Sequence, residues 1–229
     1  MDSKIKKYVT QYNSIEKLIG KSGNDVFLIK NDDVPICVMK VFKNELDLFN
    51  EINSYNLLLK HNFKTVKVLH YDVTDLSLFL SVASGQLVAN YIMQNTDDTE
   101  KLYNVGYIIG LTLKKLHQTN TGKRNAGNKT YVHGDPSPRN FFINDTNEII
   151  IIDAKNLRDE FLGFPACDYH RFIFSLRCFA KTEKLYNSDH IIKHIIDGFI
   201  NGYGQKIFSE QSDLRYDKHW QRIYDKLKQ

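Results

Sequence analysis

The chain has 229 residues, of which 42% are hydrophobic and 25% are charged, and its formal net charge is +4. This length and composition suit one large globular domain, or two compact lobes that share a cleft. The mild positive charge would favour anionic small molecules, but no dense basic tract is present, so we expect no nucleic-acid partner.

The three cysteines are Cys37, Cys167 and Cys178, and none has the spacing of a metal-ligand pair. This pattern favours a reducing compartment and argues against a zinc site. The N-terminus is polar and basic, unlike a secretory signal, and no run approaches the roughly 20 apolar residues of a membrane span. We therefore expect a cytoplasmic protein, and peripheral contact with the inner face of a membrane stays open.

Residues 15–42 alternate short apolar runs with turns, which predicts successive β-strands. One of these turns contains Gly20 and Gly23. Lys40 lies among apolar residues in the middle of the strand predicted over 36–42. Burying an ammonium group is costly unless a carboxylate or a phosphate pairs with it, so we expect such a partner.

A helix is predicted over residues 45–60, where apolar side chains recur at helical spacing. Glu51 lies beside the apolar stripe and could point inward toward Lys40. Glu45 is the competing partner, but it is nearer the helix start, where a carboxylate simply complements the helix dipole.

Two further strands are predicted over 65–71 and 76–82, followed by a break of small residues at 83–86. A long helical pattern then covers 100–120 and contains the pair Leu116-His117. Later helices are predicted over 169–179, 189–203 and 213–228.

The densest group of chemically reactive residues follows the long helix. His133-Gly-Asp135 is followed by Asn140, and a continuous apolar run at 149–152 ends directly before Asp153. Such a run predicts a buried strand, and a carboxylate at its end needs a partner. Carboxylate and amide oxygens are the ligands that Mg²⁺ prefers.

This order, His-Gly-Asp, then Asn, then an apolar strand that ends in Asp, resembles the catalytic core of the kinase-like superfamily that includes the aminoglycoside, choline and lipopolysaccharide-sugar kinases. The resemblance extends from Gly20 to about Arg177, and includes a Gly-x-Pro-x-x-Asp run that ends at Asp168, whose aspartate commonly braces the catalytic loop. It implies a two-lobed α+β protein-kinase-like fold. The small β-rich N-lobe with one helix would cover residues 1–83, and the mainly helical C-lobe 84–229.

The resemblance also implies cofactors and roles. ATP and Mg²⁺ are the expected cofactors, Asp135 is the expected catalytic residue, and Asn140 and Asp153 are the expected metal ligands. The nucleotide-binding residues it implies are Lys40, Glu51, Gly20 and Gly23.

Several basic and ionisable residues near this loop allow two interpretations. His133 could be an acid or a base, but its counterpart usually supports the loop through hydrogen bonds. Arg139, Lys155 and Arg158 could contact a phosphorylated acceptor, or could form a solvated basic rim.

The chain departs from protein kinases at the metal strand, where Asp153 is followed by Ala-Lys rather than Phe-Gly, and no Ala-Pro-Glu segment follows. This favours a small-molecule or glycan hydroxyl as the acceptor. Small size and the run Pro138-Arg-Asn140 resemble the lipopolysaccharide core heptose kinases, which implies a lipid-linked sugar as a partner. The alternatives are a minimal Ser/Thr protein kinase and a non-catalytic pseudokinase that acts as a binding module.

Overall fold

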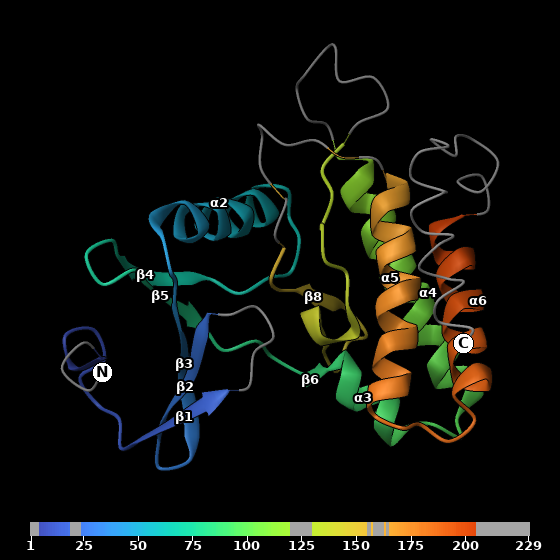
Figure 1. Cartoon of the computed structure of the whole chain (residues 1–229), viewed down its shortest axis with the longest axis horizontal. Coiled ribbons are helices and arrows are strands. Elements are labelled where there is room, and N and C mark those ends of the chain that lie inside the picture. Colours follow the sequence, from blue (N-terminus) through green and yellow to red (C-terminus); the bar gives the residue numbers. More distant parts are fainter. Residues whose placement is uncertain are drawn as a thin grey trace.

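The computed structural model describes residues 5–18, 24–119, 130–154, 157, 163 and 165–204. Its N-terminal part is a five-stranded antiparallel sheet with the strand order β1-β2-β3-β5-β4 (Figure 1). The strands are β1 (Ser14–Leu18), β2 (Asp25–Asn31), β3 (Val34–Val41), β4 (Val68–Asp72) and β5 (Ser77–Ser81).

Helix α2 (Glu45–Lys60) covers one face of this sheet. It begins at Asn44, whose side chain accepts a hydrogen bond from the N–H of Asp47, as a good N-cap does. The most deeply buried hydrophobic residues of the helix are Leu48, Ile52, Tyr55 and Leu58. The helical spacing of these side chains is the reason that the sequence forms an amphipathic helix here.

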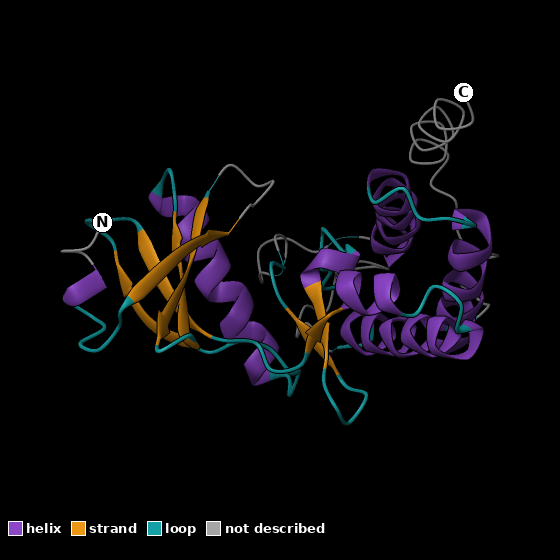
Figure 2. Cartoon of the chain, turned by 90° about the horizontal axis from the view of Figure 1, so that it is seen from below, coloured by secondary structure: helices purple, strands orange, loops and turns teal. Residues whose placement is uncertain are grey.

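The C-terminal part combines a small sheet with helices that lie side by side (Figures 1 and 2). The small sheet has the order β6-β7-β8. Its strands are β6 (Gln86–Leu87), β7 (Phe141–Ile143) and β8 (Ile149–Ile151). The helices are α3 (Val88–Gln94), α4 (Thr99–His117), the 3₁₀ turn η1 (Pro138–Asn140), α5 (Pro165–Thr182) and α6 (Ser188–Tyr203).

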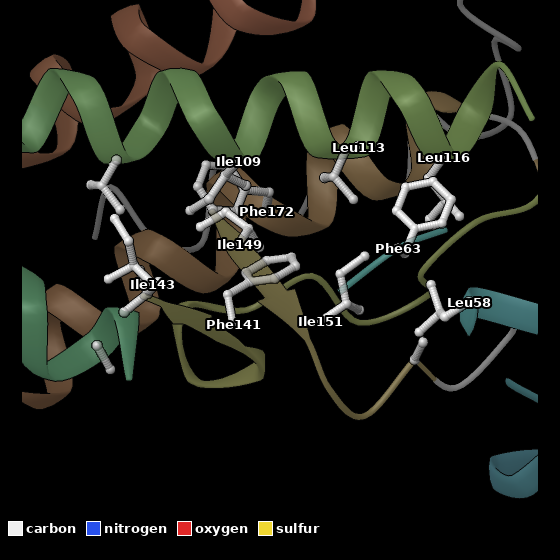
Figure 3. Packing of buried hydrophobic residues seen from close by; sticks show 14 of the residues in the cluster. Leu58, Phe63, Ile109, Leu113, Leu116, Phe141, Ile143, Ile149, Ile151 and Phe172 are labelled. Atoms are coloured by element: carbon white, nitrogen blue, oxygen red, sulfur yellow. The ribbon is translucent and has the colours of Figure 1, made fainter. Parts of the chain in front are cut away.

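The core of the C-terminal part lies between α4 and the β7–β8 hairpin, and Figure 3 shows this packing from close by. The residues of α4, β7, β8 and α5 that meet there are fully or almost fully buried: Ile109, Leu113, Leu116, Phe141, Ile143, Ile149, Ile151 and Phe172. Burial of this apolar surface holds β8 in place, and β8 in turn fixes the start of the segment that carries Asp153.

Helices α4 and α6 pack against each other backbone to backbone. Gly106 and Gly110 on α4 face α6, and Gly198 and Gly202 on α6 face α4. A Cβ atom on any of these four glycines would overlap with a backbone carbonyl oxygen of the facing helix. The close approach therefore requires residues without a side chain, and it fixes how α6 lies on α4.

The predicted elements agree with the structure in most places, and the range 45–60 matches the bounds of α2. The strand predicted over 65–71 is displaced, because β4 begins at Val68 and Thr65 instead forms a parallel bridge with Ile151 of β8. The helix predicted over 213–228 lies outside the described residues. No helix in the part of the chain that the structure describes combines the length and apolar character needed to cross a bilayer.

Candidate active site

A buried ammonium group paired with two carboxylates marks the contact between the two parts of the molecule. Lys40 of β3 is 5% exposed, and its Nζ lies 2.5 Å from Glu51 Oε1 on α2. The same Nζ lies 2.5 Å from Asp153 Oδ1, just beyond β8. Glu45, the competing partner, is exposed at the start of α2. Lys40 therefore joins the N-terminal sheet both to its helix and to the C-terminal part.

Tyr55 adds a neutral group to this cluster. Its hydroxyl donates to Glu51 Oε1 at 2.9 Å and accepts the backbone N–H of Asp153 at 3.4 Å. Asp153 has a φ of 57°, in the left-handed region that non-glycine residues seldom adopt. A residue held in such a conformation is typical of functional sites, where surrounding contacts stabilise it.

The electrostatics of the cluster keep Lys40 charged. Burial by itself would lower the pKa of Lys40, but the charges of Glu51 and Asp153 and their hydrogen bonds outweigh burial and raise it. The ammonium group is therefore retained at neutral pH. A fixed cation at this position can bind an anion such as a phosphate.

Asn140 is the last residue of the predicted catalytic loop, residues 131–140, and connects this loop with the end of β8. Its side-chain Nδ2 donates to the backbone carbonyl of Asp135 at 2.8 Å, and its backbone carbonyl accepts the N–H of Ile152 at 3.0 Å. These two bonds place Asn140 between Asp135 and Asp153. The amide nitrogen faces the loop, which leaves the amide oxygen as the end that can bind a cation.

Asp168, in the first turn of α5, also holds the loop through hydrogen bonds to its backbone. Its two oxygens accept the backbone N–H groups of His133 at 2.6 Å and of Gly134 at 2.8 Å. Gly134 has a φ of 82°, which only glycine adopts readily. The bracing role that the sequence resemblance gave to Asp168 is thus present as two hydrogen bonds.

Asp168 is itself supported by two helix ends. His117, the last residue of α4, contacts Asp168 through Nε2 at 3.0 Å and the Tyr203 hydroxyl through Nδ1 at 2.6 Å. Burial by itself would raise the pKa of Asp168, but the hydrogen bonds from His117 and the loop amides outweigh it and lower the pKa. Asp168 therefore stays ionised and keeps accepting the loop N–H groups.

The side chain of His133, a residue of the loop, is fully buried. Its ring lies edge-on to Phe141, and Nδ1 accepts the N–H of Asp135 at 3.3 Å. Burial lowers the pKa of His133 and outweighs the opposing charges of the nearby aspartates. A buried neutral ring that accepts a loop N–H fits the supporting role rather than that of an acid or a base.

The basic residues predicted around the site have different outcomes. Arg139 lies on η1, where its guanidinium pairs with Glu183 and lies over the ring of Phe179. The predicted positions Lys155, Arg158, Gly20 and Gly23 all lie outside the described residues.

The donor set fits a magnesium ion. Within the described residues, no three His, Cys, Asp or Glu side chains gather into a metal cage. Asn140 and Asp153 instead offer one neutral and one charged oxygen from adjacent segments. Mg²⁺ characteristically uses one or two such protein ligands and completes its shell with water and substrate phosphates.

Several residues that hold the site together are not among the predicted site residues. Tyr55 was predicted only as an apolar position of α2, although it bridges Glu51 and Asp153. Arg171 and Ser175 of α5 contact the carbonyls of Gly134 and Pro136 in the predicted catalytic loop, and neither was a predicted site residue. Their spacing of four residues on a predicted helix was the only sequence signal.

Comparison with solved structures identifies the fold. The chain matches the ternary complex of streptomycin, ATP and APH(2'')-IIa over 96% of its length and 95% of that chain, with a TM-score of 0.53 and 13% identity. It matches the ADP-bound aminoglycoside phosphotransferase APH(2'')-Ib over 97% and 95%, with a TM-score of 0.57 and 14% identity. The chain has the kinase-like fold of the aminoglycoside phosphotransferases.

An aminoglycoside-3'-phosphotransferase of type VIII shares this phosphotransferase fold, with a TM-score of 0.56 and 12% identity over 87% of this chain and 98% of that one. No known family model and no curated protein matches the sequence. The matches to solved phosphotransferase structures confirm the predicted two-lobed α+β architecture.

Proposed function

We propose that this protein transfers the γ-phosphate of ATP, with Mg²⁺, to a hydroxyl group of a small molecule. The observation that carries the proposal is the Lys40–Glu51–Asp153 cluster, joined through Asn140 to the loop that presents Asp135. A phosphoryl-transfer site needs a fixed cation, oxygen ligands for a metal and a carboxylate near the acceptor, and little else from the protein. The residues proposed for these three tasks are Lys40 for the cation, Asn140 and Asp153 for the metal, and Asp135 for the carboxylate near the acceptor.

Each residue has a role that follows from its position. Lys40 binds the nucleotide phosphates, and Glu51 holds the ammonium group in place. Asn140 and Asp153 hold Mg²⁺, which supplies charge neutralisation to the phosphates when bound. Asp135 orients the acceptor hydroxyl and accepts its proton. Gly20 and Gly23 lie outside the described residues, and their proposed contact with the nucleotide rests on the sequence resemblance alone.

For the acceptor we propose a sugar hydroxyl, and the lipopolysaccharide core heptoses are the first class to test. The support is the run Pro138-Arg-Asn140 and the strand end at Asp153 without Phe-Gly. Arg139, Lys155 and Arg158 are the proposed contacts for an acceptor that already carries phosphate. Such a phosphate would compete with Glu183 for the guanidinium of Arg139. A lipid-linked acceptor would bring the enzyme to the inner face of a membrane from the cytoplasm.

An acceptor screen tests the proposal. The purified protein is incubated with ATP and Mg²⁺ and with heptose-containing core saccharides, aminoglycosides or mixed proteins, and both ATP consumption and mass gain of the acceptor are scored. Asp135→Asn is the inactive comparison, and Asp145→Asn, an exposed carboxylate in the turn after β7, is the matched control. We expect a phosphorylated saccharide with the wild type and the control only. Phosphorylation of proteins alone would favour the protein-kinase alternative, and binding of ATP without any transfer would favour the pseudokinase.

A further inference from the structure

Side chains on one face of α5 form hydrogen bonds with the backbone of residues 133, 134 and 136 in the predicted catalytic loop. Asp168, Arg171 and Ser175 are three and four positions apart, so their side chains lie on the same side of the helix. All three contact the backbone of the loop. Arg171 and Ser175 take no part in the Lys40–Glu51–Asp153 cluster or in the proposed metal donor set.

The contacts of Arg171 and Ser175 fall on either side of Asp135. Arg171 Nη1 donates to the carbonyl of Gly134. Ser175 Oγ lies 3.0 Å from the carbonyl oxygen of Pro136 and 2.9 Å from that of Phe172 on its own helix, so its single hydroxyl hydrogen is shared between these two acceptors. The carbonyl groups of the residues before and after Asp135 are therefore both bonded to side chains of α5.

The third carbonyl of this stretch, that of Asp135 itself, accepts from Asn140 Nδ2. Three consecutive backbone carbonyls are thus each held by a different side chain. Loop backbones usually leave such carbonyls to solvent, because bonding them within the protein requires donors at fixed positions. The arrangement restricts the direction in which the Asp135 side chain leaves the backbone.

The peptide group of Gly134 is the point at which the loop most needs restraint. Glycine has the widest conformational freedom of any residue, and Gly134 directly precedes Asp135. Asp168 accepts the N–H of Gly134, and Arg171 donates to its carbonyl. Both ends of this residue are fixed by charged side chains, whose hydrogen bonds are about twice as strong as neutral ones.

We propose that Arg171, assisted by Ser175, is a positioning residue that fixes Asp135 for proton acceptance. This inference rests on the proposed function, since Asp135 must be the base. Arg171 touches neither the nucleotide cluster nor the metal donors, so its loss disturbs the alignment of Asp135 and spares nucleotide binding. A misalignment of about 1 Å at a reacting group can cost about a hundredfold in rate.

The experiment compares Arg171→Met, Arg171→Lys and the wild type. Lys181→Met is the matched control, because Lys181 is an exposed cation on the same helix and has no contact with the loop. Three quantities are measured: amide hydrogen exchange over residues 131–140 without nucleotide, the Kd for Mg·ATP, and kcat for ATP turnover with water as acceptor. We expect Arg171→Met to raise exchange in the loop, lower kcat by about tenfold or more and leave Kd within about twofold.

The lysine variant keeps one positive donor without the guanidinium geometry, so we expect kcat and exchange values between those of the wild type and the methionine variant. Ser175→Ala should lower kcat by a few-fold, and Lys181→Met should match the wild type. If Arg171→Met does not fold, the lysine and serine variants provide the same three measurements.

The outcomes separate the positioning role from the proposed function. Unchanged exchange in the loop of Arg171→Met overturns the positioning role whatever the rate does. Parallel losses in kcat, Kd and melting temperature, with no recovery in the lysine variant, overturn it as well, because they show a general structural defect. If the wild type neither binds nor turns over ATP, the proposed function fails, and the exchange measurement alone then decides whether Arg171 holds the loop.

Discussion

The two halves of the candidate site are held by different kinds of bond. The nucleotide half is a cluster of ion pairs in which Lys40 connects α2 to the end of β8. The loop half, by contrast, is held through its backbone by Asp168, Arg171, Ser175 and Asn140. Ion pairs can exchange one anion for another, whereas a loop with three consecutive carbonyls bonded to side chains has few alternative conformations.

This difference matches the two tasks of a phosphotransferase. The Asp153 carboxylate beside Lys40 occupies a position that a nucleotide phosphate could take, so the charged half can rearrange on binding. The loop half has to present Asp135 in one orientation throughout, since positioning is most of what phosphoryl transfer asks of a protein. Substitutions at Asp135 and at Lys40 should each alter one half of the site and spare the other.

The largest effect is expected from Asp135→Asn. The amide keeps the shape of the carboxylate but cannot accept the acceptor's proton, so kcat should fall by about a thousandfold. The Kd for Mg·ATP should stay within about twofold, because the charged cluster is intact. Steady-state turnover and calorimetric titration measure the two quantities. Equal losses in both would show that Asp135 belongs to the binding half.

The second effect is expected from Lys40→Met, which removes the buried cation but preserves most of the side-chain volume. The Kd for Mg·ATP should rise by about ten- to a hundredfold, as expected for loss of a charge-assisted bond to phosphate. The exposed Lys43→Met, three residues along, is the matched control. A wild-type Kd in Lys40→Met would remove this residue from the nucleotide site.

The third prediction concerns the helices that support the loop. Gly198→Ala would force α6 away from the backbone of α4, and overpacking of this kind costs about 1–3 kcal/mol of unfolding free energy. Chemical denaturation measures the loss, with Lys193→Ala on the exposed side of α6 as the control. An alanine variant as stable as the wild type would show that the helices do not pack as closely as described.

The smallest effect is a pH dependence that originates in the loop half. The pKa of His133 is lowered on folding, so below the ordinary value of 6.5 the unfolded chain binds a proton at this residue that the folded protein does not. The unfolding free energy should therefore fall as the pH drops below that value, by up to about 1.4 kcal/mol per pH unit from this residue. Denaturation of the wild type and of His133→Gln across this range measures the difference. Equal slopes in the two proteins would contradict the assignment.

The sequence predicted the parts of the fold that depend on local pattern. Helix α2 was predicted because its apolar side chains recur at helical spacing within one short stretch. Lys40 and Asp153 stood out because a charge in or after an apolar strand needs a partner. Helix α3 was not predicted, since it is short and has no side-chain cap.

The rest depends on contacts between distant segments. Arg171 meets Gly134 only because α5 lies under the loop in one particular register. The glycines of α4 and α6 show their purpose only once the two helices are packed together. Tyr55 was expected in the apolar core, and nothing in its spacing indicated that its hydroxyl would bridge Glu51 and Asp153.

The most direct test of the central claim is a crystal structure of the protein with Mg²⁺ and a non-hydrolysable ATP analogue. The account predicts that the phosphates contact Lys40, that the metal is bound by Asn140 and Asp153, and that the backbone of residues 133–136 keeps its hydrogen bonds to α5. A nucleotide bound away from Lys40, or a loop that rearranges while the Lys40–Asp153 pair persists, would contradict it.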